Sequence, residues 1–433
     1  MHKEGTIAMR KVIILCLLGL FIVSGLLFAA GAKEGAAKPA AAPELVLMHD
    51  KGGNPNYQPF YEEVGKAAKA AIGVGFTPTP YPTTDAYIAA VRAALPTNKA
   101  PDLYTWWSTY RMKDLIDQGL VADLTDLWDK HKSEYSQGIR DAFTFNGKVY
   151  GLPYSIEYWG IWYNVDVFKK YNLSVPKTWD EFLKINATLK QNGVTPMFQT
   201  VQQRWPTFIL FEEMVARQNP DLYVDLCEGR AKYTDPGVRK AFAVWADLIE
   251  KGYFTDPSTD LFADAPRLFN SGEVAMIPVG SWYFTVLTSA SVPESKVGFF
   301  VMPPPVASVG NVAIMEAAPV LVAKNAPNLD AAKKVIDWWM TPEGNLVMAK
   351  QLNQFPPNMK ADTSFLPKVK TDIAVMLQTG KYRILNRYWE ATPTAICEAA
   401  VDKFAEFILN PKSVDKVLAD LDKIASDYWA KNK

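Results

Sequence analysis

The sequence predicts an α/β protein of two domains or lobes. The chain has 433 residues, which is more than one hydrophobic core usually organises. Apolar residues make up 49% and charged residues 21% of the chain, a composition typical of a globular protein rather than a disordered one. Short apolar runs alternate with helical patterns, and this alternation favours a mostly parallel sheet with helices on its faces.

The first half of the chain contains strand and helix patterns in turn. Apolar runs bounded by turn residues predict strands at residues 44–49, 73–81 and 102–107. Helical patterns follow these runs and predict helices at residues 59–71 and 84–95, the second capped by Thr84, and one that stops at Gly119. Asn146-Gly147 lies between short apolar runs, and this dipeptide is typical of a two-residue hairpin turn.

The second half of the chain is richer in helical patterns. Thr178-Trp179-Asp180-Glu181 has the spacing of a capping box and predicts a helix that ends near Gly193. Strands are predicted at residues 274–280 and 297–304, and residues 312–324 are either a strand pair or one buried run. Further helices are predicted at residues 237–251, up to Gly272, at 328–339, after Pro342, and in three patterns from 366 to the end.

The N-terminal residues have the pattern of an export signal. A basic pair at residues 10–11 precedes an apolar run over residues 12–30, and Ala30-Gly31-Ala32 fits a signal-peptidase site. Residues 1–32 are therefore interpreted as a signal peptide and residues 33–43 as a linker, which predicts a periplasmic or extracellular protein. Because the apolar run is also long enough to span a bilayer, an uncleaved membrane anchor is the alternative.

Two cysteines lie outside the predicted signal peptide. An oxidising compartment would permit a disulfide between Cys227 and Cys397. Two free buried thiols are equally compatible with the sequence.

The charge and the aromatic content of the chain indicate which kinds of molecule it can bind. The formal net charge is zero, and no basic patch is present that could hold a phosphate backbone, so no nucleic-acid partner is expected. The chain has 13 Trp and 19 Tyr. These side chains join an apolar face to a polar edge and suit semi-polar ligands.

Patterns for catalysis are few. Beyond the predicted signal peptide the histidines are His49 and His131, and neither lies in an H-E-x-x-H pattern. The sequence has no G-x-G-x-x-G, P-loop or C-x-x-C motif, so no metal and no cofactor is predicted. A glycosidase needs only two carboxylates about 5 to 10 Å apart and is the enzymatic alternative. Since the pattern lacks the eightfold repeat of a barrel, we predict that the protein is not an enzyme.

Five segments, together with the exported start, resemble extracellular solute-binding proteins of ABC importers. Within that family they are similar to the sugar-binding branch that includes maltose-binding protein. The segments occur in the family's order and are PDLYTWWSTYRMKDLIDQGLVADL, NGKVYGLPYSIEYWGIWYNVDVFKKY, PKTWDEF, FNSGEVAMIPVGSWYF and APNLDAAKKVIDWWMTPEGN. They cover most of the mature chain.

The resemblance implies two discontinuous α/β lobes that close over a ligand in the cleft between them. It places lobe 1 at residues 44–155 and 303–355 and lobe 2 at residues 156–302 and 356–433. The chain is expected to cross between the lobes near Ser155–Gly160 and again near Phe299–Pro303. The implied ligand is a sugar or oligosaccharide, the implied partner is an ABC permease, and the protein is expected to be a monomer.

The resemblance also implies ligand-binding residues at the ends of strands. Asp50 and Lys51 follow the first strand, in a loop that reaches sugar hydroxyls in maltose-type binders, although a solvated turn is the alternative. Trp106, Trp107 and Ser108 lie at the carboxyl end of the third strand, where open α/β sheets bind ligands. Strand alternation lets only one of the two tryptophans face the cleft.

The aromatic stretch from Tyr150 to Phe168 is expected to be both hinge and cleft wall. Glu157 matches a glutamate that accepts sugar hydroxyls, because it lies seven residues before Asn164, and a structural salt bridge is its alternative role. One of Tyr158 or Trp159 is expected to face the cleft beside it. Alternation sends other rings, including Trp162 and Tyr163, into packing.

The other implied ligand-binding residues lie further along the chain. Trp282 matches a tryptophan that stacks on a sugar ring, and Gly280 would let the backbone approach the ligand. Trp205, Glu316 and Trp389 match more loosely, and packing is the alternative role for each. A polyol or a glycerophosphodiester is the alternative ligand class. A phosphate would need cations, and those on offer are Lys51, Arg204 and Arg387.

Overall fold

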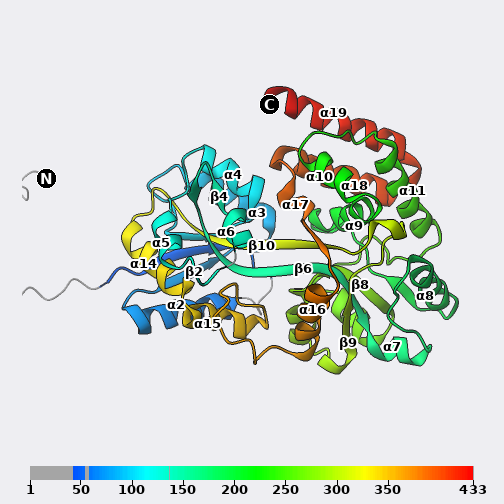
Figure 1. Ribbon diagram of the computed structural model, residues 1–433, viewed down its shortest axis with the longest axis horizontal. Helices are drawn as coiled ribbons and strands as arrows, with labels where there is room; N and C mark the ends of the chain where they lie inside the picture. The colour runs from blue at the N-terminus through cyan, green and yellow to red at the C-terminus, as the bar shows by residue number, and fades with distance from the viewer. Residues whose placement is uncertain (1–41, 54–57, 136, 433) are drawn as a thin grey trace, which may run out of the picture. The chain divides into compact units, whose positions relative to one another are not determined.

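The computed structural model describes residues 42–53, 58–135 and 137–432 (Figure 1). The predicted signal peptide and most of the predicted linker lie outside these residues. Among the helices of the described residues, none combines the length and the apolar character needed to cross a membrane.

One nine-stranded sheet organises the described chain, with the strand order β2-β1-β3-β10-β6-β8-β7, β11 added beside β10 and β9 beside β6. The strands of this sheet are β1 (Leu45–His49), β2 (Phe76–Pro80), β3 (Leu103–Thr105), β6 (Leu152–Asn164), β7 (Thr195–Met197), β8 (Val274–Gly280), β9 (Val297–Phe300), β10 (Val312–Val322) and β11 (Arg383–Asn386). A separate hairpin pairs β4 (Thr144–Phe145) with β5 (Lys148–Val149).

The prediction of a mostly parallel sheet is wrong. The outer pairs are parallel, including β1 with β2 and β3, and β7 with β8. The central pairs β3–β10, β10–β6 and β6–β8 are antiparallel, since β6 runs out along the sheet and β10 returns beside it, and β11 is parallel to β10. Strand direction is set by this return of the chain, and the local pattern contains no signal for it.

The strands β6 and β10 link the two lobes (Figure 1). Leu152–Trp159 of β6 pairs with β10, and Trp159–Asn164 pairs with β8 and β9. The first predicted crossing therefore lies in β6. The second passage is β10 itself, which comes later than Phe299–Pro303, since Phe299 lies in β9 and pairs with Trp162. The exact residues at which one lobe ends and the other begins stay a prediction.

A break in the ladder interrupts the β6–β10 pair at one rung. Its register shifts between Ala318 and Pro319, and Pro319 lies opposite Pro153. Proline has no backbone N–H to donate to a ladder. This rung is thus the weakest part of the pair.

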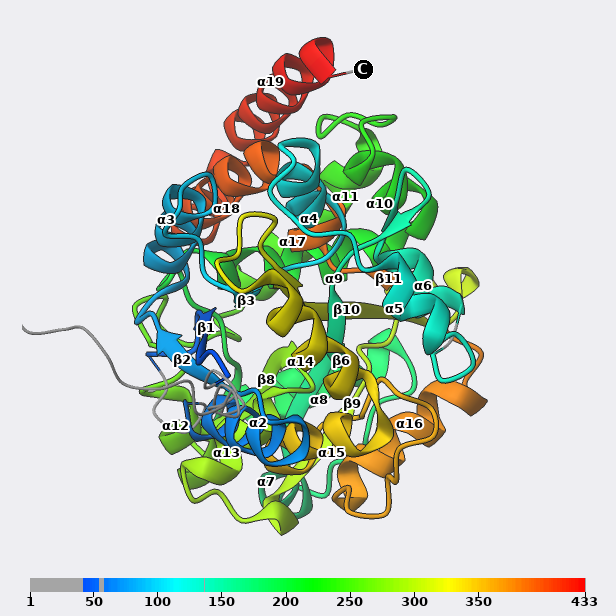
Figure 2. The ribbon, with the colours of Figure 1, turned by 90° about the vertical axis from the view of Figure 1, so that its left-hand side faces the viewer.

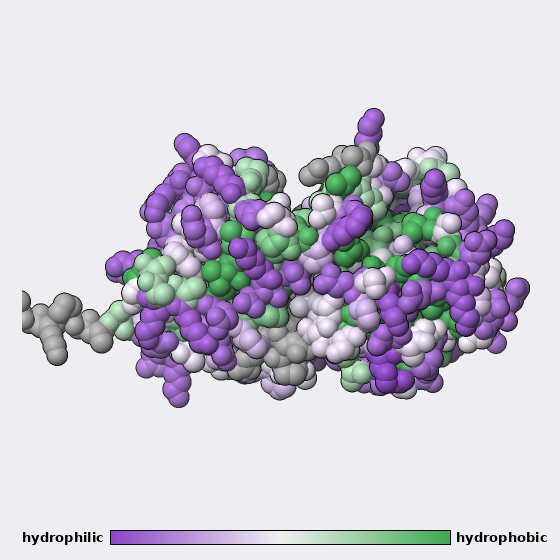
Figure 3. Space-filling model, turned by 90° about the horizontal axis from the view of Figure 1, so that it is seen from below, coloured by the Kyte–Doolittle hydropathy of each residue, from purple (hydrophilic) through white to green (hydrophobic). Residues whose placement is uncertain are grey.

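Helices pack against the sheet and against one another. Figures 1 and 2 show α2, α14 and α15 together beside β1 and β2, and α4 beside α17 and α18. The bounds of the described helices are α2 (Gln58–Ile72), α3 (Thr84–Ala94), α4 (Thr109–Asp117), α5 (Thr125–Lys130), α6 (Gln137–Ala142), α7 (Val165–Lys170), α8 (Trp179–Gln191), α9 (Phe208–Gln218), α10 (Pro220–Cys227), α11 (Pro236–Glu250), α12 (Ala265–Ser271), α13 (Tyr283–Ser289), α14 (Leu329–Met340), α15 (Pro342–Leu352), α16 (Lys368–Thr379), α17 (Tyr388–Ala391), α18 (Thr394–Leu409) and α19 (Val414–Asn432). On the face seen in Figure 3, hydrophilic and hydrophobic residues are interspersed over both lobes.

Local signals in the sequence are found where they were predicted, with one shift. Thr178 and Glu181 form the capping box of α8, and Asn146 and Gly147 turn the β4–β5 hairpin with positive φ angles of 51° and 75°. The cap of α3 is Thr83 rather than Thr84, because its side chain accepts a hydrogen bond from the Ala86 N–H. Of residues 312–324, Val312–Val322 form the single strand β10.

The second half of β6 is core, as predicted. Trp162 is fully buried, its ring centroid lies 4.8 Å from that of Phe299, and its Nε1 donates to the Gly280 carbonyl at 3.1 Å. Tyr163 packs against Phe168 with centroids 4.5 Å apart. These contacts fix β6 against β8 and β9.

Candidate functional site

A cavity of about 710 Å³ lies where β6 and β10 pass between the lobes. Tyr154 and Ser155 of β6 border it, as do Glu316, Ala317 and Ala318 of β10. Among the described residues, the aromatic side chains that line the cavity are Tyr61, Trp106, Trp107, Tyr154, Trp205, Phe208, Phe262, Trp282 and Trp389.

Seven of these rings form a continuous series, which we call the aromatic arc: Trp106, Trp107, Trp389, Phe208, Trp205, Trp282 and Phe262. Successive ring centroids lie 5.1, 6.2, 5.7, 6.1, 6.2 and 6.1 Å apart. The rings come from the ends of β3 and β8, from α9 and α17, from the short 3-10 helix Trp205–Thr207 and from the loop before α12. Segments distant in the sequence therefore build one aromatic surface.

Both tryptophans that follow β3 border the cavity, whereas alternation predicted only one. Trp106 is 2% exposed, and its Nε1 donates to the Arg111 carbonyl at 2.9 Å. Trp107 is half-buried, with its centroid 5.3 Å from the Arg111 guanidinium. The chain has already left the strand at Trp106, because β3 ends at Thr105, so the alternation of a pleated strand does not apply.

A charged group on one side of the cavity centres on Arg387. This guanidinium is ion-paired with Glu316 of β10 and with Glu390 of α17, where Nε and Oε2 are 2.8 Å apart. The indole Nε1 of Trp159 also donates to Glu316 at 3.1 Å. Burial raises the pKa of Glu316 to about 7, against the opposing effect of Arg387. Glu316 is placed to accept hydrogen bonds on this side of the cavity.

A second ion pair lies at the end of β1. Lys51 Nζ is 3.0 Å from Asp50 Oδ2, and the Lys51 N–H donates to His49 Nδ1 at 3.2 Å. The His49 ring stacks on Tyr61 with centroids 4.3 Å apart. Asp50 and Lys51 both line the cavity, and the Lys51 side chain is 35% exposed.

Arg204, in the loop before the 3-10 helix, forms ion pairs with α18 and with α3. Its guanidinium lies 2.8 Å from Asp402 and 3.4 Å from Glu398, both in α18, and 3.4 Å from Asp85 in α3. Arg204 and Asp85 both line the cavity. The backbone of Arg204 has a positive φ of 61°, which a non-glycine residue rarely adopts.

Glu157 does not border the cavity. Its carboxylate lies 3.3 Å from the ammonium of Lys370 in α16 and accepts hydrogen bonds from the hydroxyls of Ser155 and Ser281. Lys370 donates in turn to the Ser281 carbonyl at 2.6 Å. The side chains of Lys370 and Glu157 are 0% and 1% exposed. The structure therefore gives Glu157 the structural salt bridge that was its alternative role, and Glu316, its register partner on β10, borders the cavity instead.

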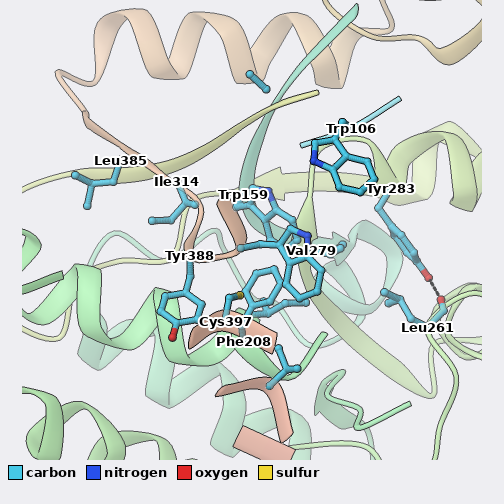
Figure 4. Packing of buried hydrophobic residues seen from close by; sticks show 14 of the residues in the cluster. Trp106, Trp159, Phe208, Leu261, Val279, Tyr283, Ile314, Leu385, Tyr388 and Cys397 are labelled. Carbon is cyan, nitrogen blue, oxygen red and sulfur yellow. Dashed lines mark hydrogen bonds between the residues drawn. The ribbon is translucent and has the colours of Figure 1, made fainter. Parts of the chain in front are cut away.

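Tyr158, Trp159 and Gly280 lie outside the lining of the cavity and contact residues near it. Trp159 is fully buried beside Phe208 (Figure 4), and Tyr158 donates its N–H to the Ser281 hydroxyl at 3.1 Å. A Cβ on Gly280 would lie 2.5 Å from Nε1 of Trp282. The glycine thus makes room for the indole rather than for a ligand.

The structure divides the implied ligand-binding residues into two sets. Those that line the cavity are Asp50, Lys51, Trp106, Trp107, Trp205, Trp282, Glu316 and Trp389. Those outside its lining are Ser108, Glu157, Tyr158, Trp159 and Gly280. Ser108 is buried at the start of α4. Whether any of the lining residues contacts a ligand stays a prediction.

Sequence reasoning missed several lining residues, among them Tyr61, Tyr154, Phe208, Phe262 and Glu390. Tyr154 belongs to the aromatic stretch and could have been found by the same argument as Glu157. Phe208 and Glu390 sit in helical patterns that also fit a core, and Phe262 follows no pattern at all. Only the tertiary fold brings them to one cavity.

The described residues include side chains of the kinds that bind metal ions, and two cysteines. They contain no group of three or more His, Cys, Asp or Glu side chains that could hold a metal ion. Cys227 and Cys397 are both free and buried, so the open question between a disulfide and two thiols resolves to thiols. Burial raises the pKa of each thiol to about 12, which keeps both protonated and unreactive.

A cavity between two lobes, lined by aromatic rings, carboxylates and ion-paired cations, defines a two-lobed binding protein. A family model described as "bacterial extracellular solute-binding protein" matches residues 63–377. The chain belongs to this family. The resemblance of its five segments is therefore confirmed at the level of the family.

Individual relatives are similar in sequence or in fold. An uncharacterized ABC transporter extracellular-binding protein of Pyrococcus horikoshii is 35% identical over 186 residues, which are 42% of this chain and 43% of that protein. A bacterial solute receptor with an exclusive preference for β-D-galactopyranose superposes with a TM-score of 0.82 at 20% identity, over 90% of this chain and 98% of its own. A maltose-bound protein of T. maritima gives a TM-score of 0.74 at 18% identity, over 89% and 99%. These likenesses confirm the two-lobed α/β fold.

Proposed function

We propose that the protein is the extracytoplasmic substrate-binding component of an ABC importer and binds a sugar or oligosaccharide in the interlobe cavity. The observation that carries this is the aromatic arc with carboxylates beside it. Aromatic faces cover the apolar C–H face of a sugar ring, while carboxylates accept its hydroxyls. The names of the similar proteins, which include receptors for galactopyranose and maltose, support the same class.

The cations of the cavity favour an uncharged ligand over a phosphate. Among the described lining residues these are Lys51, Arg204 and Arg387, and each is already ion-paired with at least one carboxylate. At Lys51 and Arg387, a phosphate would have to displace the largely buried carboxylates of Asp50, Glu316 and Glu390 and leave them without their cation, which is costly. A sugar hydroxyl needs no such exchange. The glycerophosphodiester alternative is therefore not favoured.

Transport follows from closure of the lobes. A ligand that contacts both lobes binds the closed form better and shifts the population toward it. We propose that an ABC permease recognises that form, that the protein acts as a monomer, and that it is exported through its N-terminal segment.

The test is isothermal titration calorimetry with a panel of neutral sugars on the mature protein. Trp282→Ala should weaken binding at least tenfold, the equivalent of about 1.4 kcal/mol, because it removes a lining ring. Trp179→Ala is the matched control, since Trp179 starts α8 and is not among the residues that line the cavity. Binding by no neutral sugar would overturn the function, and an unchanged Trp282→Ala affinity would overturn the site. Turnover of a chromogenic glycoside would indicate an enzyme instead.

A further inference from the structure

The volume of the cavity is large for one sugar ring. At ~30 Å³ per water, 710 Å³ is room for roughly 24 waters, and a single pyranose is far smaller than that. Ligand cavities usually enclose most of the ligand that they bind. A monosaccharide would leave most of this cavity filled with water, so the volume suits a ligand of more than one ring.

The accessible rings of the aromatic arc lie in two places. Trp107 is half-buried at one end, and we call it the first platform. Trp205, Trp282 and Phe262, also half-buried, form the second platform at the other end. The rings between them, Trp389 and Phe208, are 4% and 0% exposed and offer little surface to a ligand. Each platform therefore presents an aromatic surface of its own.

A single pyranose has the size of one aromatic ring, so it stacks on one platform at a time. From Trp107 the arc passes through Trp389 and Phe208 before it reaches Trp205, with centroid steps of 6.2, 5.7 and 6.1 Å. The platforms also belong to different segments, because Trp107 follows β3 while Trp282 follows β8. A ligand with two sugar rings can stack on both.

Hydrogen-bonding groups accompany the arc along its length. The Arg387 guanidinium lies 5.7 Å from the Phe208 ring, which places its partners Glu316 and Glu390 near the middle of the arc. At the second platform, Asp260 lines the cavity next to Phe262 and accepts the Phe262 N–H at 2.7 Å. Hydroxyls of successive sugar rings would thus find acceptors between the platforms as well as at the second one.

We infer that the ligand is a neutral oligosaccharide of at least two pyranose rings, one on each platform, and that a monosaccharide is a poor ligand. This inference rests on the proposed function and names the length of its ligand. It differs from the preference of the galactopyranose receptor, which shares the fold at 20% identity. The lining of the cavity, rather than the fold, carries the length preference.

The experiment compares sugars of increasing length on the intact mature protein. Calorimetric titrations use three series of neutral sugars, α-1,4-glucosides, β-1,4-glucosides and β-1,4-xylosides, each from one to five rings. In the series that binds, affinity should rise at least tenfold from one ring to two or three and then level off. A monosaccharide that binds as tightly as its longer homologues would overturn the length inference and leave the sugar function standing. Failure of every length would overturn the function itself, and the inference with it.

Variants of the two platforms separate their contributions. Trp107→Ala and Trp282→Ala should each weaken oligosaccharide binding at least tenfold, and only one of them should affect binding of the monosaccharide unit. Trp107→Phe keeps an aromatic face and should retain most of the affinity, which guards against a misfolded alanine variant. Unchanged oligosaccharide affinity in a folded Trp107→Ala protein would overturn the two-platform inference.

Discussion

The buried ion pair behind the cavity makes a strong prediction about stability. Lys370→Met should lower the free energy of unfolding by about 3–5 kcal/mol, because it leaves the Glu157 carboxylate buried without its cation. The hydroxyls of Ser155 and Ser281 still donate to Glu157, which favours the lower half of that range. The melting temperature should fall by roughly 4–6 °C.

The measurement is urea unfolding followed by tryptophan fluorescence, with a control on the same helix. Lys368→Met also removes a lysine of α16, but this side chain is 87% exposed and pairs with Asp372 at the surface, so its loss should stay within ~0.5 kcal/mol. Adding Glu157→Gln to Lys370→Met should restore much of the stability, since no unpaired charge is then buried. Equal stability of the two lysine variants would refute the reasoning.

Three further changes test other parts of the molecule. Burial lowers the pKa of His49 from 6.5 to about 4. The unfolded chain therefore binds a proton at this residue first, and stability is lost as the pH falls from 6.5 toward 4. His49→Phe should reduce this loss by up to ~3 kcal/mol in unfolding measured across that pH range, and an unchanged slope would contradict this. In Gly160→Ala the new Cβ would lie 2.5 Å from the Phe299 ring and 2.7 Å from the Phe300 carbonyl, which should cost about 1–3 kcal/mol in urea unfolding; wild-type stability would show that β6 and β9 can separate. Arg204→Gln removes the ion pair to Asp85 across the cavity and should enlarge the radius of gyration of the unliganded protein in X-ray scattering, whereas an identical scattering curve would show that the pair does not hold the lobes together.

Local interactions were predictable from the sequence because their partners are a few residues apart. The capping box of Thr178 and Glu181 and the Asn146-Gly147 turn belong to this kind. The direction of β10 was not predictable, because residues 312–324 fit any buried apolar run. Their pairing depends on where the chain returns.

The same limit applies to the site. The resemblance predicted a place at the cavity for Trp205, Trp282 and Trp389, which line it. It also predicted Glu157 there, because no residue near Glu157 in the sequence indicates its partner Lys370, which is 213 residues away. A carboxylate that binds a ligand and one that binds a distant lysine have the same local sequence. Only the fold separates Glu157 from Glu316, its neighbour across the two strands.

The paired prolines of β6 and β10 mark the rung at which a bend between the lobes would break the fewest backbone hydrogen bonds. Pro153 and Pro319 share the one rung at which the register shifts, and neither can donate an N–H to the other strand. The rungs from Ser155 to Trp159 stay paired, so a change in the angle between the lobes would be absorbed mainly at the proline rung. Glu316 lies on the far side of that rung and would travel with the second platform. Closure would then move Glu316 and Trp282 together toward Trp107.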